Sequence, residues 1–213
     1  MTAAEQISGY RFATPDHSCA HPYLLPAVRS ELAMFYQGVR DRRIFDLGCG
    51  NGSVAAALAL EGYEPCGVDP SVEGIAQAQA AYPRLHLEIG SAYDDLVARH
   101  GRFPAVVSLE VVEHVYAPRA YARTLFDLVE PGGIALVSTP YHSYWKNLAL
   151  AAAGRMDRHF TALWDHGHIK FWSMDTLGRL LREAGFEAVR FRRVGRFPPL
   201  AKSMIAVARK PTR

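Results

Sequence analysis

The sequence predicts an α/β fold, an open sheet of seven mostly parallel strands with helices on both faces and an antiparallel last strand. Three observations indicate this class. Short apolar runs alternate with amphipathic stretches, which is the pattern of successive strand–helix–strand units. The first strand candidate runs into a glycine-rich turn that opens a helix. The length of 213 residues suits one domain of this kind.

The expected elements follow one another in a regular order. Residues 1–22 are expected to form an N-terminal arm. An amphipathic helix, in which Val28, Leu32, Phe35 and Val39 recur at helical spacing, is expected to follow and to complete the segment 1–40. Strands are expected at 43–47, 65–68, 85–89, 105–109, 134–138, 189–194 and 204–208. Helices are expected at 53–60, 72–81, 118–129 and 173–184.

Turn and cap residues support these boundaries. Pro131, Gly132 and Gly133 predict a turn before the fifth strand, while Ser173 and Gly185 fit the two ends of the last helix. We therefore expect a single domain with a core at 41–139, an insertion at 140–172 and a C-terminal helix and strands at 173–213.

Composition narrows the function classes. No apolar run reaches 18 residues and the first residues lack the pattern of a signal peptide, so we expect a cytoplasmic protein. The three cysteines show no Cys-x-x-Cys spacing, which disfavours a disulfide framework or a zinc knuckle. Residues 178–213 carry a net charge of +8, against +3 for the whole chain. No nucleic-acid motif accompanies this charge, so no nucleic-acid partner is expected.

The glycine-rich turn is the most informative stretch. Its sequence is IFDLGCGNG at residues 44–52, with glycines at 48, 50 and 52 rather than in the GxGxxG spacing of dinucleotide sites. Asp46 would repel a pyrophosphate but attract a sulfonium and an ammonium group. Asp69, at the end of the next strand, can accept hydrogen bonds from both ribose hydroxyls. The pattern favours S-adenosylmethionine (SAM) over a nicotinamide cofactor, and an oxidoreductase is the alternative.

On these residues the chain resembles the Rossmann-like class I SAM-dependent methyltransferases. The runs LEVVEHV at 109–115, PGG at 131–133 and STP at 138–140 are most similar to the polyprenyl-benzoquinol O-methyltransferase-like branch, which acts on small molecules. The resemblance covers residues 40–139 with specific motifs and 173–210 more loosely. It implies a cofactor site formed by Asp46, Gly48, Cys49, Gly50, Gly52, Asp69, Pro70, Ser91, Ala92, Tyr93 and Glu110.

The same resemblance raises the question of a metal ion. Some quinol O-methyltransferases of this branch use a divalent cation at a Glu-x-x-Glu-His string, which corresponds here to Glu110, Glu113 and His114. The string also occurs in relatives for which no metal is implied. A divalent metal is therefore not expected.

The insertion at 140–172 has the composition of a substrate pocket. It leaves the carboxyl end of the fifth strand and holds all three tryptophans. We predict that it forms a lid, with substrate contacts from Tyr141, Trp145, Trp164, His166 and Trp172. The alternative is a satellite hydrophobic cluster. An oxygen acceptor needs a general base, for which the candidates in order are His168, His114 and His142.

The sequence therefore predicts methyl transfer from SAM to a small molecule, with oxygen favoured as the acceptor atom and nitrogen or carbon as the alternatives. A non-catalytic SAM-binding module is a further alternative. The loop at 195–202 places Phe197 and Leu200 beside Arg196 and Lys202. These residues suit an amphipathic or anionic substrate, or peripheral contact with a membrane.

Overall fold

A computed structural model describes residues 16–160, 162–164, 167–197 and 200–213. The strands are β1 (Arg43–Leu47), β2 (Glu64–Asp69), β3 (His86–Ile89), β4 (Phe103–Leu109), β5 (Val129–Pro140), β6 (Glu187–Val194) and β7 (Ser203–Arg209). The described helices are α2 (His21–Phe35), α3 (Ser53–Ala59), α4 (Val72–Ala81), α5 (Leu96–His100), α6 (Pro118–Leu128), α7 (Tyr144–Ala152), α8 (Met156–Phe160) and α9 (Met174–Glu183).

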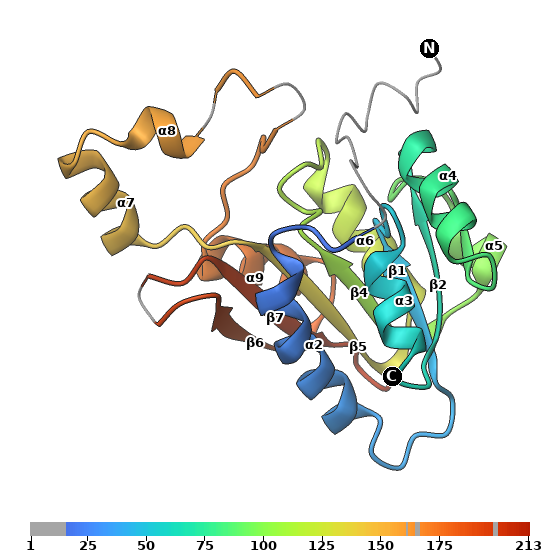
Figure 1. The fold of residues 1–213 in the computed structure, drawn as a ribbon. Coiled ribbons are helices and arrows are strands. Elements are labelled where there is room, and N and C mark those ends of the chain that lie inside the picture. The colour runs from blue at the N-terminus through green and yellow to red at the C-terminus, as the bar shows by residue number, and fades with distance from the viewer. Residues whose placement is uncertain (1–15, 161, 165–166, 198–199) are drawn as a thin grey trace.

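The strands form one seven-stranded sheet in the order β3-β2-β1-β4-β5-β7-β6 (Figure 1). Strands β1 to β5 run parallel to one another, and β7 runs antiparallel to both β5 and β6. The predicted fold class is thus confirmed. Chain order reverses between β1 and β4, which are neighbours in the sheet. Ligands of open α/β sheets bind at the carboxyl ends of the strands at such a point.

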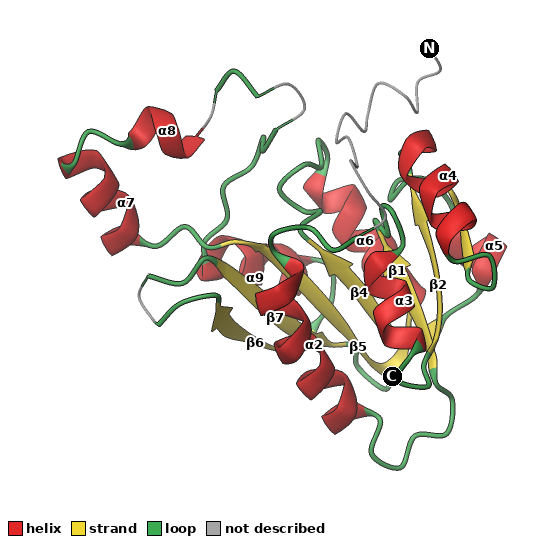
Figure 2. Cartoon of the chain, viewed as in Figure 1, coloured by secondary structure: helices red, strands yellow, loops and turns green. Residues whose placement is uncertain are grey.

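Helices cover both faces of the sheet (Figure 2). Every residue of β4 is buried, as expected of a central parallel strand. On one face Phe45 and Val106 pack with α6 and α9, and on the other Ile44 and Val107 pack with α2 and α3. Because neighbouring side chains on a strand point to opposite faces, the two cores hold β1 and β4 firmly in place.

Local chemistry sets the boundaries of the elements. Ser173 caps α9 in a reciprocal pair with Thr176, and Gly185 follows the helix with a φ of 110°. Ser71 caps α4 by accepting a hydrogen bond from the Gly74 amide. The sequence-based boundaries at these ends are confirmed within a residue.

Three local expectations were wrong. Residues 131–133 do not form a separate turn but lie inside β5, where pairing with β4 skips from Phe103↔Val129 to Ala105↔Ile134. Helix α2 begins at His21, inside the expected arm, and ends at Phe35, so Val39 lies beyond it. The helix α5 was not expected, because five residues are too few to show a period.

The insertion differs from the rest of the chain. Its helices α7 and α8 contain no buried residues. Figure 1 shows them to one side of the sheet rather than on either of its faces. In the described parts of the chain, no helix is long and apolar enough to cross a bilayer.

Candidate functional site

The glycine turn after β1 is held in a conformation that only glycine adopts easily. Gly48 and Gly50 have φ angles of 89° and 52°. A Cβ on Gly48 would lie 2.4 Å from a methyl carbon of Val111. The amides of Gly48 and Cys49 donate hydrogen bonds to the Val68 carbonyl at 2.8 and 3.0 Å. Sterics and backbone bonds therefore fix this turn against the end of β2.

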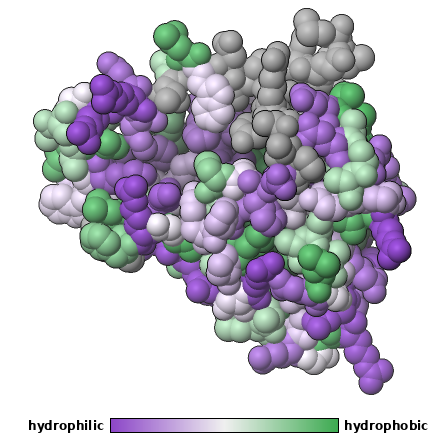
Figure 3. All heavy atoms as spheres, in the orientation of Figure 1, coloured by the Kyte–Doolittle hydropathy of each residue, from purple (hydrophilic) through white to green (hydrophobic). Residues whose placement is uncertain are grey.

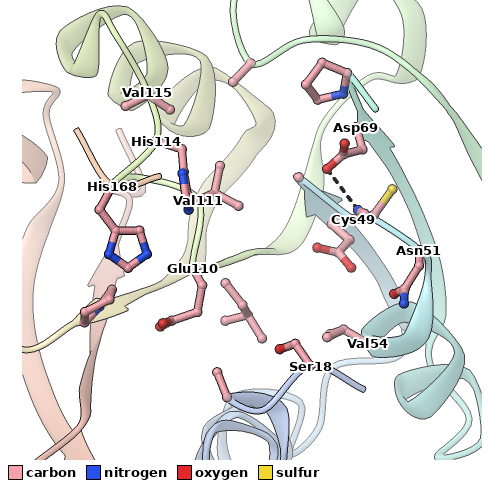
Figure 4. Close-up of a pocket in the computed structure, with 18 of the residues that line it drawn as sticks. Ser18, Cys49, Asn51, Val54, Asp69, Glu110, Val111, His114, Val115 and His168 are labelled. Carbon is pink, nitrogen blue, oxygen red and sulfur yellow. Dashed lines mark hydrogen bonds between the residues drawn. The ribbon is translucent and has the colours of Figure 1, made fainter. Parts of the chain in front are cut away.

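Asp69 connects the turn to the end of β2. Its carboxylate accepts hydrogen bonds from the Gly50 amide at 2.9 Å (Figure 4) and from the Ser71 amide at 2.8 Å. Burial raises the pKa of Asp69 to about 6, although the two amide bonds lower it. The carboxylate thus lies at the edge of the cavity with an orientation that two backbone groups determine.

Asp46 lies on β1 just before the turn. Burial, and then the neighbouring Asp69 charge, raise the pKa of Asp46 to about 7. One of its carboxylate oxygens is buried and has no hydrogen-bond partner in the described structure. A buried acid of this kind is stabilised in its charged form by a cationic ligand. The site therefore fits the positively charged groups of SAM.

Glu110 directly follows β4 and faces the same cavity. Its backbone φ of 57° is unusual for a residue with a side chain. Its carboxylate accepts hydrogen bonds from the hydroxyls of Ser138 at 2.8 Å and Ser203 at 3.4 Å. Burial raises the pKa of Glu110 to about 7, against the opposing effect of the serine bonds. Strands β5 and β7 thus position a third acidic group at this edge of the sheet.

These acids line a cavity of about 760 Å³ that extends along the strand ends. Figure 4 shows Cys49, Asn51 and Asp69 on one side and His114 and His168 on the other. Of the predicted cofactor residues, those that line the cavity are Asp46, Gly48, Cys49, Gly50, Asp69, Pro70, Ser91, Ala92, Tyr93 and Glu110. Gly52 does not, because it packs against α4 and β3, where a Cβ would meet a methyl carbon of Leu87 at 2.6 Å.

Two histidines and a tryptophan form the opposite side of the cavity. The rings of His114 and His168 lie edge to face with centroids 4.9 Å apart, and Trp164 lies 5.3 Å from His168. The Ile169 and Lys170 amides donate to the Glu113 carbonyl at 3.0 Å, which joins the insertion to the loop after β4. Burial, and then His114, lower the pKa of His168 to about 4, so the ring is neutral at pH 7.

The acid–imidazole cluster beside this wall could hold a divalent cation. Glu113, His114 and His168 each offer a ligand atom within 4.8 Å of the others. The Glu113 carboxylate oxygens are buried without hydrogen-bond partners in the described structure, and burial raises the pKa of this group well above its ordinary value. Glu110, expected from sequence in such a set, is bonded to Ser138 and Ser203 instead.

Three other predicted substrate residues, Tyr141, Trp145 and Trp172, and the third candidate base, His142, do not line the cavity. Trp172 and Tyr141 are buried in the core, where the Trp172 indole donates to the Val112 carbonyl at 3.1 Å. Trp145 is 65% exposed on α7, because that helix packs on no described core. His142 packs against the ring of Phe171. His166 lies outside the described residues.

The structure also brings together wall residues that sequence reasoning missed. Ser18 lies just before α2, Tyr23 lies in the first turn of α2, and Ser203 is the first residue of β7. The Tyr23 and Ser203 hydroxyls are 3.2 Å apart although 180 residues separate them in sequence. No local pattern marks such residues, since only the sheet order places them beside Glu110.

Comparison with known proteins identifies the family. A family model described as a methyltransferase domain matches residues 21–190. The chain belongs to the SAM-dependent methyltransferase family. SAM is therefore the cofactor, and the sequence-based family prediction is confirmed.

Individual relatives agree with this assignment. The chain is 36% identical over 154 residues to a ubiquinone biosynthesis O-methyltransferase from Dinoroseobacter shibae, and the match covers 69% of this chain and 60% of the relative. A protein of the same name from Azorhizobium caulinodans is 36% identical over 154 residues, covering 68% of this chain and 58% of the relative. The chain thus spans about three fifths of the length of these curated relatives.

Solved structures share the fold of the methyltransferase. A SAM-dependent methyltransferase from Archaeoglobus fulgidus superposes with a TM-score of 0.65 at 16% identity, over 88% of this chain and 93% of that one. Magnesium protoporphyrin IX methyltransferase from Synechocystis PCC 6803, solved with bound S-adenosylhomocysteine, has a TM-score of 0.63 at 19% identity. The superposition covers 87% of this chain and 82% of that one. At these identities the likeness concerns the fold alone.

Proposed function

We propose that this methyltransferase transfers the methyl group of SAM to a hydroxyl oxygen of a small acceptor. The observation that carries the proposal is one continuous cavity with the SAM-binding turn at one side and the His114–His168 pair at the other. An oxygen acceptor is supported by that pair, since a hydroxyl must lose its proton. The relatives named as O-methyltransferases support the same choice.

In this proposal the acidic groups bind the cofactor. Asp69 accepts hydrogen bonds from the ribose hydroxyls, while Asp46 and Glu110 face the cationic sulfonium and ammonium groups. Ser91, Ala92 and Tyr93, which follow β3 and line the cavity, contact the adenine. The turn at residues 48–50 brings the backbone close to the methionine part.

The transfer is an in-line displacement. SAM supplies an electrophilic methyl group; the acceptor oxygen forms the new bond to it as the carbon–sulfur bond breaks, and S-adenosylhomocysteine leaves. His168 is neutral and accepts the proton that the hydroxyl loses, with His114 as the second candidate. The Glu113 carboxyl lies beside both rings.

The acceptor in this proposal is amphipathic, with a mainly apolar body and a polar group. Trp164 and Ile169, both in the cavity wall, are each 45% exposed. Further exposed apolar side chains lie on α7, where Trp145 and Leu148 flank Lys146, and apolar and hydrophilic residues are mixed over the visible face (Figure 3). A mixed apolar and basic surface suits peripheral contact with an anionic membrane, from which a lipophilic acceptor enters the cavity.

Calorimetric titration tests the cofactor assignment. S-adenosylhomocysteine is expected to bind saturably, and NADH is not. The reverse result would favour the oxidoreductase alternative. If S-adenosylhomocysteine binds but no methyl transfer from SAM is seen to phenols (for example catechol), to amines or to carbon acids, a non-catalytic SAM-binding module would be favoured instead.

Replacing the proposed base tests the mechanism. The substitution His168→Ala is expected to lower kcat on a phenolic acceptor about a hundredfold, with the affinity for S-adenosylhomocysteine within about twofold of wild type. His86→Ala, at an exposed position on β3, is the matched control and should leave both unchanged. Wild-type turnover in His168→Ala would remove this residue as the base.

A further inference from the structure

Charges are unevenly distributed along the cavity wall. The acids Asp46, Asp69 and Glu110 line it, and among the described lining residues Lys202 is the only lysine or arginine. The cofactor brings two positive groups and one carboxylate, so its cationic part is matched by the acids. Lys202 supplies the opposite charge at the β7 side of the cavity, next to Ser203.

The structure holds Lys202 from several directions. Its amide donates to the Val194 carbonyl at 2.9 Å, and its carbonyl accepts from the Tyr141 amide at 2.9 Å. Gly195, with a φ of 88°, packs so closely that a Cβ there would lie 2.9 Å from Lys202 Cβ and 3.1 Å from Cγ. The ammonium nitrogen lies 5.2 Å from the centre of the Tyr23 ring. The side chain is thus exposed but directed toward the wall that Tyr23 forms.

The ammonium group of Lys202 is available to a ligand. None of the ion pairs formed among the described residues includes Lys202. The nearby Lys146 differs, because its ammonium donates to the Tyr141 carbonyl at 3.0 Å and it does not line the cavity. The hydroxyls of Tyr23 and Ser203 lie in the same wall, but Ser203 donates to Glu110 and Tyr23 pairs with Ser203, so the Lys202 ammonium is the group in this wall that can meet a negative charge.

We propose that Lys202 binds an anionic group of the methyl acceptor, and that the acceptor class is an aromatic hydroxy acid whose carboxylate pairs with this residue. One ammonium matches one negative charge, which fits a carboxylate better than a doubly charged phosphate, for which several donors are usual. The apolar wall at Val111, Val115 and Trp164 suits the aromatic ring. This inference rests on the proposed function, since it concerns the acceptor of that reaction.

Two related acceptors test the inference. The substitution Lys202→Met is expected to lower kcat/KM for 3,4-dihydroxybenzoate about tenfold more than for catechol, which has the same hydroxyls but no carboxylate. Lys202→Arg, which keeps the charge, should retain most of the wild-type ratio of kcat/KM for 3,4-dihydroxybenzoate to kcat/KM for catechol. Lys170→Met is the matched control, because Lys170 lies 5.8 Å from the Tyr116 ring but does not line the cavity, and the ratio should stay at the wild-type value.

Equilibrium binding separates this inference from the proposed function. Both acceptors are titrated into the protein loaded with S-adenosylhomocysteine, so the preference is measured even if no methyl transfer occurs. Tighter binding of 3,4-dihydroxybenzoate than of catechol, lost in Lys202→Met, supports the inference. Equal binding of the two by the wild type overturns it. Weaker binding of S-adenosylhomocysteine itself by Lys202→Met also overturns it, because Lys202 would then pair with the carboxylate of the cofactor.

Discussion

The ends of β1, β2 and β4 and the insertion at 140–172 form opposite sides of one cavity but are built differently. Strand β4 is fully buried and β1 nearly so, and the backbone angles of Gly48 and Glu110 are set by close contacts and hydrogen bonds. In the insertion, α7 and α8 bury no residue. Under the proposed function, this difference means that the core preforms the cofactor side, while the acceptor side includes segments that the core constrains less.

The largest expected effect is on the free energy of unfolding, and it differs between two tryptophans of the insertion. Trp172→Ala should lower the free energy of unfolding by about 3–5 kcal/mol, because a large buried side chain is removed and the Val112 carbonyl loses its donor. Trp145→Ala, at an exposed position, should change it by less than about 0.5 kcal/mol. Urea denaturation measures both. Equal losses would mean that α7 packs as firmly as the core.

The next largest effect is expected on the affinity for the cofactor product. Asp69→Ala should weaken binding of S-adenosylhomocysteine about a hundredfold, since hydrogen bonds to two ribose hydroxyls are lost together with those that orient the turn. Glu64→Ala, an exposed acid on the same strand, is the control. Calorimetry gives both affinities, and an unchanged value in Asp69→Ala would exclude this residue as the ribose ligand.

The cofactor side should also show a pH dependence. The pKa values of Asp46 and Asp69 are raised to about 7 and about 6 by burial, so both lose protons as the pH rises from 5 to 8. A bound cation favours the charged carboxylates, and the affinity for SAM should therefore rise about tenfold between pH 6 and pH 8. S-adenosylhomocysteine lacks the sulfonium charge and should show a smaller rise. An identical pH dependence of the two ligands would contradict the placement of Asp46 near the sulfonium.

The smallest expected effect tests the surface of the insertion. The double substitution Trp145→Ser and Leu148→Ser should weaken association with phosphatidylglycerol vesicles about fivefold, because apolar area at the interface is lost. Leu60→Ser is the control, since Leu60 is 90% exposed at the end of α3. Co-sedimentation measures the association. A wild-type protein that does not sediment with vesicles would exclude the proposed membrane contact.

The sequence by itself determined the sheet, the glycine turn and the acids Asp46 and Asp69. Each of these has a local signal: an apolar run, a spacing of glycines, or an acid at a strand end. A parallel sheet brings the carboxyl ends of its strands to one edge, so the cofactor residues could be placed together before any coordinates were known.

Only the tertiary structure decided the composition of the acceptor side. Tyr23 and Ser203 meet beside Glu110 because α2 packs on the sheet and β7 pairs with β5. Trp164 reaches the cavity while Trp145 faces solvent and Trp172 is buried, although composition alone made all three equivalent. The physical reason is that burial depends on which elements pack together, and aromatic residues in an aperiodic segment carry no signal of that packing.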